Sequence, residues 1–286
     1  MTTRDGRRLE YLVRGPANGP VMLVHGGTPN GAGDFGVVTG PATALGLRTV
    51  TYSRPGYGSS TMLPGRSVAD AVDDVVDLLD ELGVDGFHTF GWSGGGPHAL
   101  ACAALLPGRC RAAALLAGVG PYGAEGLDYL AGMDRVNVEE FGAAIEGYAA
   151  IEAYLTALLP ELHAVTADAM ADGLGGLLAD VDRVALTGQL ASDMATSMHR
   201  AIEQGIGGWR DDDLAFVGDW GFDLATITVP VSIWQGRQDR MVPFAHGEWL
   251  ARAIPSAEPH LFEHEGHLSL IAQADAIFGD LLQRAA

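Results

Sequence analysis

The sequence has 286 residues, of which 48% are hydrophobic and 19% charged, a composition typical of a folded globular protein rather than a disordered one. Its 36 acidic residues outnumber its 17 basic ones, all arginine, and the resulting net charge of -19 disfavours binding to nucleic acid or to an anionic membrane. The polar residues 1–8 lack the apolar core of a secretory signal, no apolar run approaches the length of a membrane span, and two cysteines suit a reducing compartment, so we expect a cytoplasmic protein.

Five short runs of apolar residues, often β-branched or aromatic, predict strands at residues 21–25, 48–52, 87–90, 112–116 and 231–234. Four of them end directly in Gly, Ser or Arg-Pro, as strands of a parallel sheet do when both faces of the sheet are buried. The segment 226–229 marks where the sheet is expected to resume after the middle of the chain, and 261–263 marks a later strand.

The clearest helical pattern covers residues 67–82, where Ser67 and Asp70 form a capping box and Gly83 follows the end. Residues 94–106 and 271–284 show similar patterns, so strands and helices alternate at both ends of the chain. This alternation predicts a mostly parallel sheet with right-handed crossovers and helices on both faces. In the first helix, valines and leucines recur at helical spacing and leave four aspartates on the outer side, Asp73, Asp74, Asp77 and Asp80.

The pattern changes over residues 122–219, where strand-like runs vanish and Ala, Leu, Met and Glu dominate. Asn137, Pro160 and Ser192 mark the expected helix starts in this segment. The sequence therefore predicts an α/β core domain formed by residues 1–121 and 220–286, interrupted by a helical cap at residues 122–219.

A serine flanked by glycines follows one predicted strand and precedes a predicted helix, in the run Gly91-Trp92-Ser93-Gly94-Gly95. A nucleophile on a sharp strand-to-helix turn needs small residues on both sides, because a side chain there would collide with neighbouring backbone. The helix that follows points its free N–H groups and the positive end of its dipole at the site, which favours negative charge on a substrate oxygen. Ser93 is therefore the predicted nucleophile, although a plain glycine-rich turn can show the same letters.

A serine nucleophile needs a base that removes its proton and an acceptor that orients the base. Asp239 follows the predicted strand 231–234, and His267 follows a glycine on a loop before the last predicted helix. We therefore predict that Asp239 orients His267 and that His267 is the base for Ser93. The alternative base is His264. Five aspartates are alternatives for the acid: Asp211, Asp212, Asp213, Asp219 and Asp223. A run such as 211–213 is, however, typical of a solvated face or a helix start.

An oxyanion needs two backbone N–H donors on a loop with few side chains. The run His25-Gly26-Gly27-Thr28 closes one predicted strand, and Gly94 follows the serine. Gly27 and Gly94 are the predicted donors, with Gly26 or Thr28 as alternatives to Gly27. No HExxH motif and no Cys/His cluster occurs in the sequence, so we expect neither a metal nor another cofactor.

Five motifs in this order resemble the α/β-hydrolase family: residues 25–27 (His-Gly-Gly), 53–58 (Ser-Arg-Pro-Gly-Tyr-Gly), 91–95, Asp239 and 266–267 (Gly-His). The resemblance implies an eight-stranded, mostly parallel sheet with Ser93, Asp239 and His267 at its C-terminal edge and a helical lid above them. Members of the family hydrolyse esters, peptides, lactones or carbon–carbon bonds. The first two motifs are similar to those of proline iminopeptidases. Those enzymes, however, usually show His-Gly-Gly-Pro-Gly and a Gly-Gly-Ser-Trp-Gly elbow, where this sequence has His-Gly-Gly-Thr-Pro and Gly-Trp-Ser-Gly-Gly. Haloalkane dehalogenases and epoxide hydrolases carry Asp in place of Ser93.

These patterns predict a serine hydrolase that cleaves a carboxylic ester, or a related acyl bond, of a small and largely apolar molecule through an acyl-enzyme. The alternatives are an aminopeptidase of the proline iminopeptidase type, a cofactor-free perhydrolase or acyltransferase, and a receptor that binds its ligand without turnover. Seven cap side chains are candidates either for the wall of a pocket or for core packing: Met133, Phe141, Tyr148, Tyr154, Met194, Met198 and Trp209.

Overall fold

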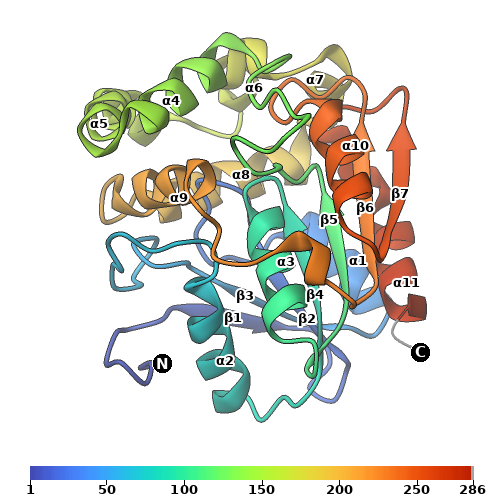
Figure 1. Ribbon diagram of the computed structural model, residues 1–286. Helices are drawn as coiled ribbons and strands as arrows, with labels where there is room; N and C mark the ends of the chain where they lie inside the picture. Colours follow the sequence, from blue (N-terminus) through green and yellow to red (C-terminus); the bar gives the residue numbers. More distant parts are fainter. Residues whose placement is uncertain (285–286) are drawn as a thin grey trace.

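A mostly parallel sheet runs through the middle of the molecule (Figure 1). The computed structural model describes residues 1–284, and within this range the sheet has seven strands in the order β1-β3-β2-β4-β5-β6-β7. Strand β1 runs antiparallel to β3, and the other neighbours run parallel. The strands are β1 (Tyr11–Arg14), β2 (Val21–His25), β3 (Arg48–Tyr52), β4 (Phe87–Trp92), β5 (Cys110–Leu116), β6 (Val231–Gly236) and β7 (Ala257–Phe262).

The predicted strands lie where their apolar runs indicated. Strands β2, β4 and β6 are buried along their whole length, which explains why both of their faces carry apolar residues. The expected total of eight strands is wrong by one within the described residues. Before β1 the chain makes one isolated bridge, between Thr2 and Arg8, because the residues between them close a tight turn in which Thr3 N–H donates to the Arg7 carbonyl. The segment 226–229 forms no strand either; residues 224–226 make a short 3-10 turn capped by Asp223.

Helices cover both faces of the sheet. On one face lie α2 (Ala71–Glu81), α3 (Gly95–Leu105) and α10 (Phe244–Ala253), and on the other lie α1 (Gly36–Ala44) and α11 (Ala274–Arg284). The capping bond from Ser67 N–H to Asp70 is present at 2.7 Å, although the helix begins only at Ala71. Asp74, predicted to face solvent, is buried and paired with Arg7 of the N-terminal segment.

Between β5 and β6 the described chain is helical, and in Figure 1 α4 to α7 lie above the sheet. The predicted starts at Asn137, Pro160 and Ser192 are wrong: the first helix begins at Arg135 with Asp134 as its cap, and the other two residues lie inside helices. The cap boundaries at residues 122 and 219 stay a prediction. No helix of residues 1–284 has the length and apolarity that crossing a membrane requires. The helices are α4 (Arg135–Glu146), α5 (Tyr148–Ala164), α6 (Met170–Leu174), α7 (Asp180–Ala185), α8 (Gly188–Ala201) and α9 (Gly207–Val217).

The parallel strands bring their carboxyl ends to one edge of the sheet. The loops after β2, β4, β6 and β7 therefore meet there, and they carry the His-Gly-Gly run, the serine, the aspartate and the histidine of the sequence prediction. The helical segment between β5 and β6 covers this edge and supplies the remaining wall of the cavity described below.

Candidate active site

Ser93 sits at the sharp turn between β4 and α3. Its φ of 55° is in the left-handed region, which a residue other than glycine adopts only when the surrounding structure enforces it. The Ser93 N–H donates to the Leu116 carbonyl of the neighbouring strand at 2.9 Å. A Cβ at Gly91 would lie 2.5 Å from the Gly95 carbonyl oxygen, and one at Gly95 would collide with the His25 carbonyl, so both flanking positions accept only glycine.

His267 and Asp239 meet at the same edge of the sheet. The His267 Nδ1 lies 2.8 Å from Asp239 Oδ2, and both side chains are buried. The other oxygen of Asp239 accepts the N–H groups of Met241 and Val242, each at 2.8 Å, while Gln235 donates to Oδ2 at 3.1 Å. Asp239 is thus fixed from three sides, and its bond to Nδ1 leaves Nε2 of His267 free to act as a base.

A cavity of about 400 Å³ brings the predicted residues together. Its wall includes Ser93, His267, Gly27 and Gly94, so the nucleophile, the base and both predicted oxyanion donors face one space. Within residues 1–284 no hydrogen bond joins the Ser93 hydroxyl to His267, a contact that commonly tightens only when substrate is bound. The alternative base His264 is exposed and does not line this cavity.

The pKa of His267 is the result of opposing effects. Burial lowers it, but the attraction and hydrogen bond of Asp239, with a smaller contribution from Asp182, outweigh burial and raise the pKa above its ordinary value. A base with a raised pKa accepts a proton more readily, which is what removal of a serine proton requires.

The loop after β2 is held by Arg54, which lies in the Arg-Pro-Gly-Tyr-Gly run. Its guanidinium donates to the carbonyl oxygens of Gly26 and Gly27, each at 2.7 Å. Because N–H and C=O point in opposite directions across a trans peptide, the N–H groups of Gly27 and Thr28 point away from Arg54. A Cβ on Gly27 would lie 3.4 Å from the Cβ of Ser93, so this loop passes directly beside the serine. Gly27 and Thr28 both remain candidates for the oxyanion donor.

Two buried carboxylates that the sequence reasoning did not assign support this arrangement. Asp212 on α9 accepts hydrogen bonds from Arg54, Arg66, Tyr57 and Thr28, and it is fully buried rather than on a solvated face as the Asp211–213 run suggested. Burial raises its pKa, but Arg54 and Arg66 hold the pKa of Asp212 well below the usual range. These partners lie 146 to 184 residues from Asp212 in sequence, so no local pattern reveals the pairing.

Asp182 on α7 is the second of these carboxylates. It accepts the backbone N–H groups of His267, Leu268 and Ser269 at 2.8 to 3.0 Å. One buried side chain from the helical segment therefore fixes the loop that carries the histidine. The carboxylate also caps the short 3-10 helix at residues 269–273, an interaction typical of helix N-termini.

Most of the remaining cavity wall is apolar. Of the seven cap side chains predicted for a pocket or for the core, Phe141, Met194, Met198 and Trp209 line the cavity. Met133 is buried in the core, and Tyr148 is largely exposed. None of the described residues that line the cavity is an arginine, and the sequence has no lysine. The wall thus suits an apolar group and provides no arginine or lysine for an anionic one.

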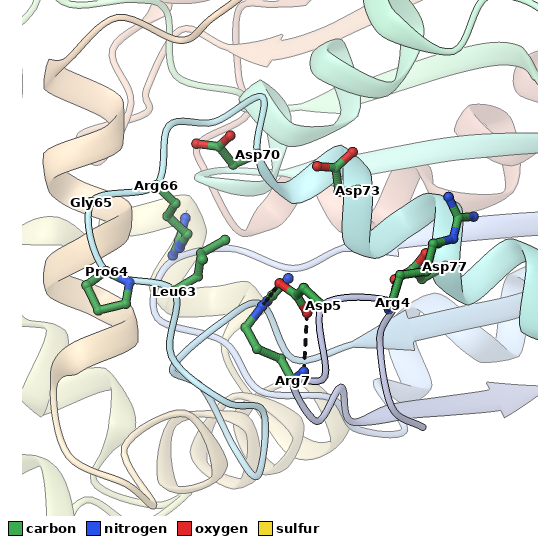
Figure 2. Close-up of a pocket in the computed structure, with 10 residues that line it drawn as sticks. All are labelled: Arg4, Asp5, Arg7, Leu63, Pro64, Gly65, Arg66, Asp70, Asp73 and Asp77. Atoms are coloured by element: carbon green, nitrogen blue, oxygen red, sulfur yellow. Dashed lines mark hydrogen bonds and ion pairs between the residues drawn. The ribbon is translucent and has the colours of Figure 1, made fainter.

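A second cavity, of about 450 Å³, lies away from the serine between the N-terminal segment and α2 (Figure 2). It is lined mainly by arginines and aspartates that are already paired, Arg7 with Asp5 and Arg4 with Asp77. This cavity contains neither Ser93 nor His267, so it is separate from the candidate active site. Among residues 1–284 no group of three or more His, Cys, Asp or Glu side chains is arranged to hold a metal ion.

The chain matches the family model described as alpha/beta hydrolase fold over residues 19–273. It is 26% identical over 281 residues to a 2-hydroxy-6-oxononadienedioate/2-hydroxy-6-oxononatrienedioate hydrolase of Cupriavidus pinatubonensis, a match that covers 93% of this chain and 88% of that one. An uncharacterized hydrolase of Bacillus subtilis is 39% identical over 110 residues, which is 37% of each chain.

Solved structures share the same fold. A hydrolase from Pseudomonas aeruginosa superposes with a TM-score of 0.70 at 21% identity, covering 99% of this chain and 96% of that one. An esterase from Exiguobacterium antarcticum superposes with a TM-score of 0.68 at 19% identity, covering 100% and 99%. At these identities the likeness concerns the path of the chain and not the substrate.

Proposed function

This chain belongs to the α/β-hydrolase family, and we propose that it is a serine hydrolase that cleaves a carboxylic ester, or a related acyl bond, of a small and largely apolar molecule. One observation carries the proposal: Ser93, held at a positive φ, shares a cavity with His267, whose Nδ1 is bonded to Asp239.

The proposed reaction has two steps. His267 Nε2 takes the proton of Ser93 while Oγ attacks the substrate carbonyl, and the N–H groups of Gly27 and Gly94 hold the oxyanion. His267 then gives the proton to the departing alcohol, leaving an acyl group on Ser93. A water molecule, activated by the same histidine, releases the acid and restores the serine.

Hydrolysis of a carbon–carbon bond is the second candidate, because several relatives of 26% to 27% identity over more than nine-tenths of this chain are named as hydrolases of a nonadienedioate or nonatrienedioate. A dioate carries two negative charges. The described cavity wall has no arginine and includes the carboxyl groups of Glu140 and Asp213, which would repel such a substrate. The charge of the cavity therefore favours an uncharged or cationic ester.

Turnover of short p-nitrophenyl esters tests the proposal. We expect hydrolysis by the unaltered protein and its loss by at least roughly 1,000-fold in Ser93→Ala, since the nucleophile is then missing. Ser192→Ala is the matched control, because Ser192 is exposed on α8 and only its backbone carbonyl accepts a hydrogen bond. Equal activity in Ser93→Ala and the control would refute the proposal, and an unaltered protein that neither turns over esters nor reacts with a fluorophosphonate would support the receptor alternative.

A further inference from the structure

Three carboxyl groups line the cavity above the serine without any role in the proposed reaction; Glu161 is exposed, and Asp213 and Glu140 are buried. Asp213 lies on α9 between Asp212, which bonds Thr28 of the oxyanion loop, and Phe216, whose ring would touch a Cβ placed on Gly94. Helix α9 is therefore seated directly over the serine turn. Asp213 and Glu140 of α4 both line the cavity that contains Ser93.

Asp213 is buried, and its partner is another carboxyl group. The residue is 1% exposed, and no N–H group of residues 1–284 donates to either of its carboxyl oxygens. Its neighbour is the carboxyl group of Glu140, which lies within hydrogen-bonding reach and whose Oε1 accepts the Trp209 indole N–H at 2.7 Å. The nearby Arg66 is directed at Asp212. A buried carboxyl group that only another carboxyl group partners is costly to a folded protein, so such a pair indicates a role beyond packing.

The pair carries a charge that only Arg66, which is bonded to Asp212, partly balances. Burial raises the pKa of both carboxyl groups, and mutual repulsion raises that of Asp213 further. Two adjacent carboxyl groups in an apolar cavity resist ionising together, so near neutral pH the pair keeps a shared proton and carries at most one negative charge. The described wall of the cavity offers no arginine to balance this charge.

We propose that Asp213 and Glu140 form a subsite that binds a protonated amine on the substrate. An ammonium group brings three N–H donors to a pair in which Asp213 accepts none, and it brings a positive charge to a site that attracts one. On binding, the proton shared by the two carboxyl groups leaves to water and both become carboxylates facing the ammonium. The inference rests on the proposed function, because it names the group by which the hydrolase selects its substrate.

Calorimetry on Ser93→Ala tests the subsite without any need for turnover. The probes are pentylamine and pentan-1-ol, which differ in charge and little in size. We expect the amine to bind roughly tenfold tighter or more, since hydrogen bonds to charged groups are the stronger ones. We also expect release of up to about one proton per amine at pH 7, measured from titrations in buffers of different ionisation enthalpy, and none for the alcohol. Equal affinity for the two probes would overturn the inference.

Matched variants locate the effect. Asp213→Asn and Glu140→Gln, made in the same Ser93→Ala background, should each lower the amine-to-alcohol affinity ratio, because the ammonium then faces one carboxylate instead of two. Asp219→Asn and Glu146→Gln remove the same charge from exposed positions near α9 and on α4, and they should keep the ratio of the parent. A ratio retained in both cavity variants would overturn the inference. If one cavity variant does not fold, the inference is tested by the other variant and by the proton release measured with Ser93→Ala.

Ester turnover by the unaltered protein separates this inference from the proposed function. If esters are hydrolysed but pentylamine and pentan-1-ol bind equally, the amine subsite is wrong and the hydrolase stands. If the amine binds preferentially but no ester is hydrolysed, the subsite stands and the proposed reaction is wrong.

Discussion

At the scale of single residues, the bond between Asp239 and His267 fixes which ring nitrogen faces the serine. Asp239 accepts from His267 Nδ1 at 2.8 Å, so a neutral imidazole carries its proton there and presents a lone pair at Nε2. An asparagine can donate to Nδ1 instead, which favours the opposite tautomer and leaves Nε2 protonated.

Asp239→Asn should therefore lower kcat by about 10,000-fold in ester hydrolysis. In the unaltered protein kcat/KM should fall as pH drops through the pKa of His267, which lies above the ordinary value of about 6.5, because only the neutral ring accepts a proton. The pH profile of kcat/KM measures this midpoint. An acid limb centred below pH 6 would contradict the proposed environment of His267.

The Asp213–Glu140 pair predicts a stability that falls as pH rises. In the unfolded chain both carboxyl groups ionise near pH 4, whereas burial raises the pKa of both in the folded protein. Above pH 4 the folded state therefore holds more protons than the unfolded state, and the linkage makes the pair's contribution less favourable with increasing pH.

Urea unfolding at several pH values measures this effect. The free energy of unfolding of Asp213→Asn, relative to the unaltered protein, should rise steadily between pH 5 and pH 8, because the variant lacks one of the two interacting carboxyl groups. The exposed Asp219→Asn should show a difference that does not depend on pH. A pH-independent difference for Asp213→Asn would contradict the raised pKa.

At the scale of elements, α7 is attached to the loop that carries the histidine. Three consecutive backbone N–H groups, from His267 to Ser269, donate to the buried carboxylate of Asp182. Asp182 does not face the proposed reacting atoms, so its proposed role is to position His267, and its charge adds to the raised pKa of that ring.

Asp182→Asn keeps the shape of the side chain but has one acceptor oxygen for three donors. We expect kcat to fall roughly 10-fold to 100-fold with a smaller change in KM, since a displacement of about 1 Å at a catalytic group has that effect. The acid limb of the pH profile should also move to lower pH, a shift that a merely structural role would not produce. Asp180→Asn, two residues away and exposed, is the control; identical profiles for the two variants would refute the positioning role.

The elements differ in how far the sequence predicts them. The strands were predictable because an apolar run bounded by turn residues has few alternatives, and β2 and β3 lie at the expected residues. The helix starts between β5 and β6 were not predictable in this way, because Pro160 lies inside α5 and because Asp134, not Asn137, caps α4. Helices of a cap are defined by what they pack on, which local composition does not contain.

The residues of the candidate site also differ in how far the sequence predicts them. Ser93, Asp239 and His267 follow strand ends or precede helices, so the topology places them at one edge and their order in the chain could be read directly. Asp182 and Glu140 had no such signal, because each lies in a helix and its partner is distant in sequence. Asp212 was discounted as part of an acidic run, although its partner Arg54 lies in a motif that sequence reasoning had singled out.

At the scale of the whole molecule, one buried ion cluster joins the core to the helical segment. Asp212 of α9 is paired with Arg54, which follows β3, and Arg66, which precedes α2. All three side chains are nearly or fully buried. Removing the aspartate would leave two guanidinium groups without their counter-charge inside the protein, and such a loss costs far more than that of an exposed pair.

Asp212→Ala should therefore lower the free energy of unfolding by about 3 to 5 kcal/mol, measured by denaturant unfolding. Asp219→Ala on the exposed segment after α9 should change it by less than about 1 kcal/mol. A loss of similar size in the two variants would show that the buried cluster does not join the two parts of the molecule. The net charge of -19 adds a field that draws cations toward the molecule, in keeping with an amine-bearing substrate.

The claim that Ser93 is the nucleophile can be measured directly by peptide mapping after treatment with a fluorophosphonate. The account predicts a single phosphonyl adduct, on the peptide that contains Ser93, formed in step with the loss of ester hydrolysis. An adduct on a different residue, or loss of activity while Ser93 stays unmodified, would contradict it.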